Sequence, residues 1–332
     1  MGQGSSDTMH RKYVAYLVIA GMFMLLPLFF HDNRYFMHVL ILFLIWGVVA
    51  AAWDLIIGYA GVVSLGQLAF FAVGGYASGM LSIYWAISPW AGILAGGFVA
   101  GVIGFGIGLP CLRLRGVYVA VVTLGLHLVL PTLLMRGRNI GTGGWYGLSK
   151  IPPLQLFSPL ELVPLYYVAL GIFFLLLFIM YKIINSPIGL AFVALREAES
   201  FAESLGVNQY KYKLMVFSMS ASFTGMIGAF YAHYISKITP AILNLDLFLL
   251  ILVMVVLGGK GRFPGAVIGA FVITILNEIL RAAEIYRVLV LGLIIILTII
   301  FMPDGLMGSF EFIRRIIEKK LKRKTQVTGL HS

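Results

Sequence analysis

The chain has 332 residues, of which 61% are hydrophobic and only 11% are charged. This charge content is less than half the value of about 25% that is usual for soluble domains, so a soluble globular protein is excluded. A transmembrane β-barrel is excluded as well, because the run LVIAGMFMLLPLFF lacks the alternation of polar and apolar residues that barrel strands need. The composition predicts an all-α polytopic membrane protein.

Apolar runs long enough to cross a hydrocarbon core of about 30 Å recur along the chain. They predict a transmembrane domain over residues 13–302 with eight to ten helices, since two of the runs are short. Polar tails precede and follow it at residues 1–12 and 303–332, and the two longest polar loops are residues 135–162 and 185–213. The candidate spans are residues 13–30, 35–57, 62–83, 89–109, 117–134, 163–183, 214–235, 245–257, 264–280 and 288–302.

The Lys and Arg residues are distributed unequally between the two sides of this expected topology. Of the 24 in the chain, 17 fall in the tails and in the loops on the side of 185–213, and 7 fall on the opposite side. The positive-inside rule therefore places both termini and the 185–213 loop in the cytoplasm of a cell-membrane protein, with 135–162 outside. The net charge of +11 indicates contact with anionic lipid headgroups, and no basic and aromatic patch suggests nucleic acid.

A glycine-rich segment, residues 58–79, follows the second candidate span and is not expected to form one regular helix. Its glycines weaken a helix and allow close backbone approach, and irregular backbone at membrane depth is tolerated where it lines a cavity. Ser64 and Gln67 are the polar groups that we expect to contact a solute there; the alternative is that both hydrogen-bond across helices. The expected translocation path comprises Ser64, Gln67, Gly74 and Gly75, with Thr142, Gly143 and Gly144 of the outer loop.

Few other residues suggest chemistry. Asp54 and Glu278 lie toward the ends of apolar runs, so we expect interfacial positions or, for Glu278, an ion pair with Arg281. His127 and His233 have no metal-ligand spacing and predict core positions or interhelical hydrogen bonds. A single cysteine excludes a disulfide within the chain and a cysteine metal cluster. No cofactor is expected.

The 185–213 loop carries an amphipathic helix pattern. Ser186 and Pro187 predict the helix start, and Gly206 predicts its end. An apolar stripe between them consists of Leu195, Ala198, Ala202 and Leu205. A helix lying on the membrane surface is one interpretation, but acidic side chains would then face anionic lipid. We favour a helix that docks into a groove of a soluble partner.

Three parts of this region carry a family resemblance: Ser186–Ala191, Arg196–Gly206 and Tyr212–Phe217. They resemble the coupling segment of permeases in branched-chain amino-acid ABC importers, specifically the M-type subunit. Leu190 replaces the usual arginine, and Phe201-Ala202 replaces an alanine pair. The stretches with further family counterparts are residues 55–81, 112–125, 141–149, 255–270 and 303–308.

The resemblance implies a pore-forming subunit without a catalytic site of its own. Its expected partners are a second, H-type permease subunit, two ABC ATPase subunits and an extracytoplasmic solute-binding protein. Nucleotide chemistry is not expected in this chain, because Lys260 is followed by Gly261 where a P-loop needs Ser or Thr. The residues that the resemblance assigns to ATPase coupling are Arg196, Glu197, Ala198, Glu199, Glu203 and Gly206.

Two alternatives remain open at this level. A permease of the same family could carry urea or short amides, because selectivity in such systems belongs mostly to the binding protein. An ion-coupled secondary transporter is the competing class. It predicts an essential carboxylate in the middle of a span, and neither Asp54 nor Glu278 is expected there.

Overall fold

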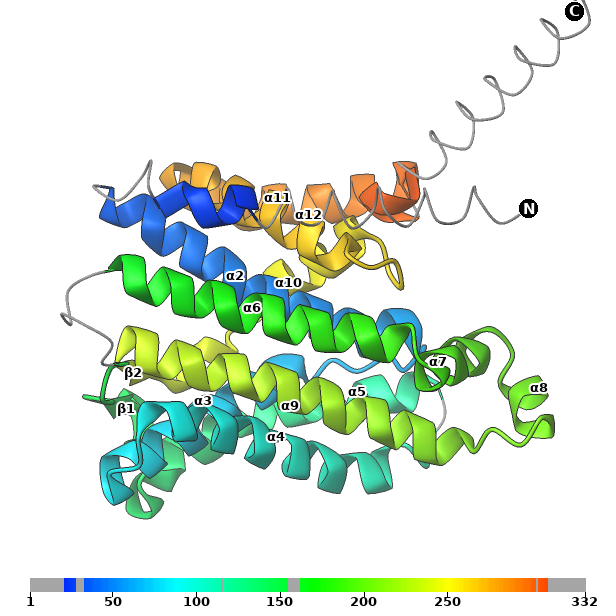
Figure 1. The fold of residues 1–332 in the computed structure, drawn as a ribbon, viewed down its shortest axis with the longest axis horizontal. Helices are drawn as coiled ribbons and strands as arrows, with labels where there is room; N and C mark the ends of the chain where they lie inside the picture. Colours follow the sequence, from blue (N-terminus) through cyan, green and yellow to red (C-terminus); the bar gives the residue numbers. More distant parts are fainter. Residues whose placement is uncertain (1–20, 28–32, 115, 155–161, 303, 310–332) are drawn as a thin grey trace, which may run out of the picture.

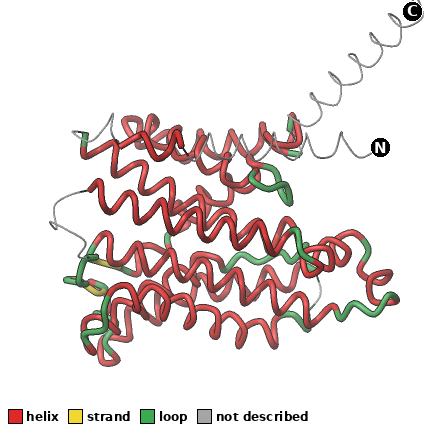
Figure 2. Tube along the Cα trace, viewed as in Figure 1, coloured by secondary structure: helices red, strands yellow, loops and turns green. Residues whose placement is uncertain are grey.

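The computed structural model describes residues 21–27, 33–114, 116–154, 162–302 and 304–309. Most of the expected span 13–30 and of the tail 303–332 lies outside these residues. The described part is an elongated bundle of helices whose long axes run roughly side by side (Figures 1 and 2). The expectation of an all-α polytopic membrane protein is confirmed.

Six helices are long and apolar enough to cross a membrane within the described residues. Two more apolar helices, α10 and α11, are shorter, so neither spans a full bilayer core by its own length. The helices of the bundle are α2 (Arg34–Asp54), α3 (Gln67–Trp85), α4 (Pro89–Cys111), α5 (Val117–Arg136), α6 (Leu162–Ile184), α9 (Gln209–Ile235), α10 (Leu245–Gly258), α11 (Gly265–Ile279) and α12 (Glu284–Phe301).

Helix α2 occupies the centre of the bundle because its sequence is apolar on every side. Buried residues make up 16 of its 21 positions, and it contacts α6, α9, α10 and α11 (Figure 1). The Asn33 side chain begins the helix by accepting a hydrogen bond of 3.1 Å from the backbone N–H of Phe36. Among the six long apolar helices of the described residues, α2 is therefore the most enclosed.

Helices α3, α4 and α9 form the most tightly packed group. Their backbones meet at Gly74, Gly96 and Gly225: a Cβ added at Gly74 would overlap the Gly225 backbone, and one at Gly96 would lie 2.6 Å from the Gly74 carbonyl. Small residues allow this approach, and dispersion contacts hold helices together where lipid removes the hydrophobic driving force. The close approach expected at Gly74 and Gly75 is thus present.

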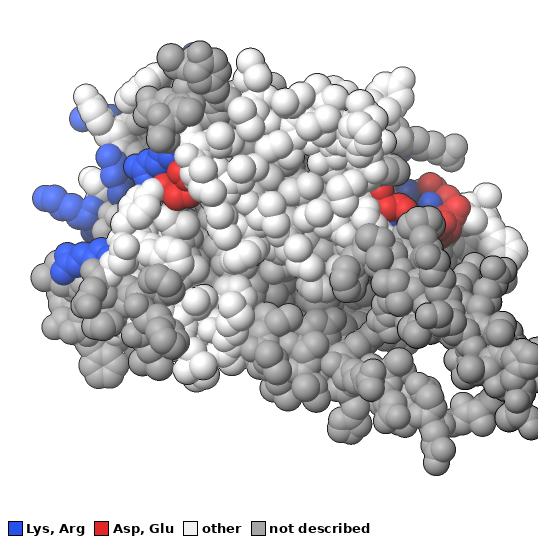
Figure 3. Space-filling view, turned by 90° about the horizontal axis from the view of Figure 1, so that it is seen from above, with Lys and Arg blue, Asp and Glu red and all other residues white. Residues whose placement is uncertain are grey.

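The two ends of the bundle carry the charges, and the belt between them is almost uncharged. In the view of Figure 3, Lys and Arg with a smaller acidic group gather at one end, acidic and basic side chains gather at the other, and white surface separates the two ends. One end holds the strand pair β1 (Leu148–Ser149) and β2 (Lys237–Ile238), in which Leu148 is opposite Ile238. The other end holds α7 (Pro187–Glu197) and α8 (Glu199–Ser204) (Figure 1). The loops expected on opposite membrane sides do lie at opposite ends.

The expected span 62–83 is wrong at its start. Helix α3 begins only at Gln67. Before it, α2 continues into a π-helix, η1 (Leu55–Tyr59), and residues 60–66 are not helical. Gly61 has φ +67°, a conformation that side-chain-bearing residues rarely adopt, so the chain turns sharply there. We call residues 60–66 the broken segment.

Leucine at Gly74 is expected to prevent α3, α4 and α9 from closing, because its side chain would occupy the volume of the Gly225 backbone. Overfilling a well-packed core costs about 1–3 kcal/mol even where side chains can give way. The measurements are the yield of monodisperse protein in detergent and its midpoint of thermal unfolding, both of which should fall. Leucine at Gly106 of α4, where nothing lies within 4 Å, is the control. Equal midpoints for the two variants would contradict this packing.

Candidate functional site

The broken segment is held by side chains from neighbouring elements, because its backbone groups lack helical partners. The indole nitrogen of Trp53 donates a hydrogen bond of 2.7 Å to the carbonyl of Ser64. The hydroxyl of Thr123, from α5, accepts a hydrogen bond of 2.9 Å from the backbone N–H of Leu65. Along the segment Val62 and Ser64 are buried, whereas Val63 is exposed. One edge of this irregular backbone therefore faces the bundle and the other faces outward.

Gln67 and Ser64, the two polar residues expected to contact a solute, have different surroundings. The amide nitrogen of Gln67 donates to the hydroxyls of Ser220, at 2.9 Å, and of Thr224 in α9. Ser64 is fully buried, and its hydroxyl has no hydrogen-bond partner among the described residues. Gln67 therefore joins two helices, as the alternative interpretation predicted, and only Ser64 retains a free polar group.

His127 of α5 is a second buried polar side chain near the broken segment. The sequence pattern did not assign it to the translocation path. An interhelical hydrogen bond was one expectation for it, but neither ring nitrogen has a partner within the described part of the chain. Its ring packs 5.2 Å from that of Phe248, which also packs 5.5 Å from Trp53. His233, in contrast, fulfils the expectation through hydrogen bonds of 2.7 Å with Ser78 and with the Pro152 carbonyl.

Gly74 and Gly75, two of the glycines assigned to the translocation path, lie outside the broken segment. Gly74 and Gly75 are buried in the contact between α3 and α9, against the backbones of Gly225 and Gly228. They contribute close helix packing there. The broken segment itself, rather than the glycines that follow it, supplies the free polar group.

The outer-loop residues Thr142, Gly143 and Gly144 form a compact turn at the β1–β2 end. The Thr142 hydroxyl donates to the Leu134 carbonyl at 2.7 Å, which ties the turn to the end of α5. Gly143 and Gly144 both have positive φ values, +75° and +65°, and Gly144 begins the 3-10 turn η3 (Gly144–Tyr146). The turn also leaves Trp145 and Tyr146 largely exposed.

The cytoplasmic-loop prediction is correct at its ends and wrong in its middle. The Ser186 hydroxyl caps α7 by accepting from the Gly189 N–H, and Pro187 is its first residue. Gly206, with φ +86°, ends α8 as expected. However, Ala198 is extended, with φ −153°, and divides the expected single helix into α7 and α8.

This break also divides the expected apolar stripe. Leu195 and Ala202 are buried, whereas Ala198 and Leu205 are exposed. The physical reason is that α7 packs against the bundle while α8 extends beyond its end (Figure 1). The periodicity of a sequence does not show at which residue a helix stops packing against its neighbours.

The charged residues of the loop point in two directions. Glu199 pairs with Lys213 of α9 at 3.1 Å, which ties α8 to the bundle. Arg196 donates to the Gly58 carbonyl in η1 and also pairs with Glu197. Glu203, at the far side of the loop, is exposed. The coupling residues expected from the resemblance are thus split between an outward-facing and an inward-facing set.

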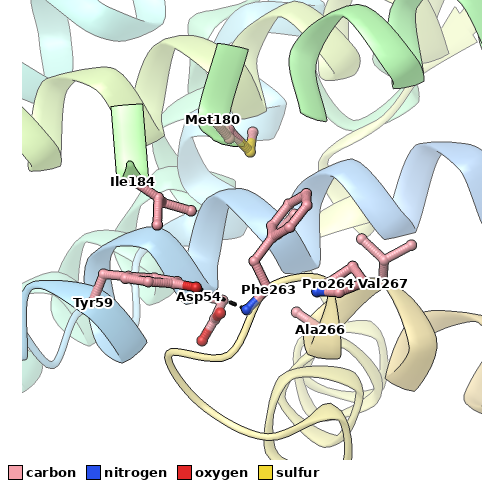
Figure 4. Close-up of a pocket in the computed structure, with 9 residues that line it drawn as sticks. Asp54, Tyr59, Met180, Ile184, Phe263, Pro264, Ala266 and Val267 are labelled. Carbon is pink, nitrogen blue, oxygen red and sulfur yellow. Dashed lines mark hydrogen bonds between the residues drawn. The ribbon is translucent and has the colours of Figure 1, made fainter. Parts of the chain in front are cut away.

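A small pocket lies next to η1, between α2, α6 and the start of α11 (Figure 4). Its lining is mostly apolar, and it contains the Asp54 carboxylate and Tyr59. The sequence predicts an interfacial Asp54, but its side chain is buried and accepts a hydrogen bond of 2.8 Å from the Gly261 N–H.

Glu278 does form the expected pair with Arg281, at 3.3 Å. Among the described residues no group of three His, Cys, Asp or Glu side chains could hold a metal ion.

The different surroundings of Gln67 and Ser64 predict opposite effects on stability. Gln67→Met should lower the midpoint of thermal unfolding, because interhelical hydrogen bonds in membrane proteins are worth about 0.6–2 kcal/mol. Ser64→Ala, as the matched polar-to-apolar control, should leave the midpoint unchanged or raise it, because the Ser64 hydroxyl has no hydrogen-bond partner to lose within the described residues. A larger loss for Ser64→Ala than for Gln67→Met would contradict these assignments.

Comparisons with known proteins agree with this architecture. The profile of the family described as branched-chain amino acid transport system / permease component matches residues 35–299. The chain is 32% identical over 279 residues to the high-affinity branched-chain amino acid transport system permease protein LivM of Escherichia coli K12. That match covers 76% of this chain and 65% of the relative, so the chain spans less than two thirds of that protein's length.

Two further relatives place the chain within a wider group of permeases. A probable branched-chain amino acid transport permease protein LivM of Methanocaldococcus jannaschii is 23% identical over 336 residues, covering 85% of this chain and 96% of the relative. The ribose import permease protein RbsC of Haemophilus influenzae is 29% identical over 137 residues, covering 39% of this chain and 42% of the relative. No solved structure matches significantly. This multi-pass membrane protein therefore belongs to the branched-chain amino acid transport system permease family.

Proposed function

We propose that the chain is the pore-forming permease subunit of an ABC importer that carries branched-chain or related amino acids. The observation that carries this proposal is helix α8, which extends beyond the helical bundle, together with a sequence that holds no nucleotide-binding motif (Figure 1). Energy must then come from separate ATPase subunits. The substrate class rests on the relatives, whose names describe branched-chain amino acid transport.

The outward face of α8 has the character of a docking surface. Phe201 and Leu205 are 64% and 70% exposed, and the acidic Glu203 lies between them in sequence. Large apolar side chains surrounded by polar groups are typical anchors at protein interfaces. Glu197, Ala198, Glu203 and Gly206 share this exposed region, so the proposal assigns them to ATPase contact.

The broken segment is the part of the bundle best suited to solute passage. Its buried side presents the hydroxyl of Ser64, which has no hydrogen-bond partner in the part of the chain that the structure describes. The same holds for the imidazole of His127, which packs on Phe248 next to Trp53. Uncharged donors and acceptors suit an amino acid, whose ammonium and carboxylate groups each need hydrogen bonds when water is removed. We propose that the translocation path runs along this segment. Thr142, Gly143 and Gly144, at the β1–β2 end of the bundle, would form its outer mouth. A second permease subunit would complete the pore.

The positive-inside rule supports an orientation with α7–α8 and both termini in the cytoplasm. In that orientation the β1–β2 end, with its exposed Trp145 and Tyr146, would face the solute-binding protein. The ion-coupled alternative gains no support from Asp54, because its carboxylate lies at the end of α2 and is already bonded to the Gly261 backbone.

Aspartate at both Phe201 and Leu205 is expected to release the ATPase subunits. Each substitution places a charge where an apolar anchor would be buried, and loss of an interface anchor typically costs about 2 kcal/mol or more. The measurement is the amount of ATPase that co-purifies with the tagged permease. This amount should fall, because the association constant decreases about tenfold for each 1.4 kcal/mol lost. Phe201→Leu with Leu205→Met, which keeps the surface apolar, is the control. Undiminished co-purification of the aspartate variant would exclude this surface.

Uptake by reconstituted vesicles tests the function itself. Vesicles containing the permease pair, the ATPases and the loaded binding protein should accumulate leucine against its gradient only when ATP is present. Vesicles containing this chain alone, with either a proton or a sodium gradient, should show no accumulation. Ion-driven accumulation by the chain alone would overturn the proposal, and ATP-driven uptake of urea or a short amide but not leucine would correct its substrate.

A further inference from the structure

Arg196, at the end of α7, lies against the transmembrane bundle rather than facing outward from the loop. Its Nη1 donates to the Gly58 carbonyl in the π-helix η1, and 32% of its side chain is exposed. A Cβ added at Gly61 would lie 2.9 Å from Cγ of Arg196. The arginine stem therefore packs on the turn at which the chain enters the broken segment.

A second set of contacts joins the same turn to the loop between α10 and α11. The Asp54 carboxylate accepts from the Gly261 N–H at 2.8 Å. The Phe263 N–H donates to the Tyr59 hydroxyl at 2.7 Å, the bond that Figure 4 draws. Two backbone N–H groups of loop 259–264 thus bond to side chains at the end of α2 and in η1.

Arg196 links these two sets of contacts. A Cβ added at Gly261 would overlap Nη1 of Arg196, and a Cβ added at Gly58 would overlap both the Asp54 carboxylate and the Gly261 nitrogen. The guanidinium therefore lies where η1 and loop 259–264 meet. Its remaining described hydrogen bonds are to Glu197, the last residue of α7.

We propose that Arg196 is a positioning residue that transmits movement of the α7–α8 segment to the broken segment, with Asp54 as the anchor on the other side of the junction. The inference rests on the proposed function, since it assumes that ATPase subunits move α8. Docking then depends on the outward face of α8, and transmission depends on the inward-facing guanidinium. Five residues separate Gly58, which Arg196 binds, from Ser64, which faces the bundle, and the sharp turn at Gly61 is the third of them.

The test uses the complete importer in vesicles with wild-type, Arg196→Ala and Arg196→Lys permeases. Arg196→Ala should co-purify with the ATPases as the wild type does, but leucine uptake should fall by about tenfold or more, because it removes a charge-assisted hydrogen bond. Arg196→Lys should recover part of the uptake, because an ammonium can still donate to the Gly58 carbonyl. Lys182→Ala, which removes an exposed cation near the cytoplasmic end of α6, is the control and should transport normally.

The anchor gives a matched pair of variants. Asp54→Asn keeps an oxygen that can accept from the Gly261 N–H, whereas Asp54→Ala removes it and leaves that N–H without its partner. Uptake should therefore fall much further in Asp54→Ala than in Asp54→Asn. Equal losses in the two variants would show that charge, not this hydrogen bond, is what matters at Asp54, and would overturn its role as an anchor.

A labelling measurement separates transmission from a general structural defect. Val63→Cys, in a Cys111→Ser background that removes the only native thiol, places a reporter on the exposed edge of the broken segment. In the otherwise wild-type complex its rate of maleimide modification should change when ATP is added. In Arg196→Ala that ATP-dependent change should vanish, whereas a general loosening would alter the rate equally with and without ATP.

The outcomes distinguish this inference from the proposed function. If the wild-type complex neither assembles nor takes up leucine with ATP, the proposed function fails. If it does both, and Arg196→Ala retains either normal uptake or the full ATP-dependent change at Val63→Cys, transmission through Arg196 is wrong while the proposed function stands.

Discussion

Between α2 and α3 the backbone leaves the α-helix inside an apolar bundle, so its N–H and C=O groups need partners from elsewhere in the chain. An unpaired backbone group in such surroundings costs several kcal/mol. Two partners come from sequence-distant elements: Thr123 of α5 binds Leu65, and Arg196 of α7 binds Gly58. A third, Trp53 at the end of α2, binds Ser64. Satisfying this one stretch of backbone therefore ties α2, α5 and α7 to a common point.

This requirement accounts for the arrangement of the rest of the bundle. Helix α2 is buried on all sides, so η1 and the broken segment begin next to the centre of the molecule rather than at its surface. Helices α3, α4 and α9 pack through glycines into a close unit beside it. A packed core of this kind changes by discrete steps and does not deform continuously. Movement is consequently easier at the irregular junctions than within the helical units, and the broken segment is such a junction.

Several features could be predicted from residue type and local order. The apolar runs, the separation of charged loops into two ends, the Ser186 cap and the Gly206 stop depend on neighbours a few residues away, and all are present in the structure. The pair between Glu278 and Arg281 is local in the same sense. The glycine-rich stretch correctly indicated irregular backbone, although the helix begins at Gln67 and not at residue 62.

Residue order alone determined that this is a helical membrane protein with an amphipathic loop, because hydropathy and capping act over one or two turns. Only the tertiary structure decided that Gln67 hydrogen-bonds to α9, while the side chains of Ser64 and His127 have no hydrogen-bond partner among the described residues. It also decided that the loop helix breaks at Ala198, and that Arg196 faces the bundle and Asp54 is buried beneath Gly261. The reason is physical: a polar side chain's role depends on which groups lie within about 3 Å of it, and here those groups come from helices far apart in the sequence.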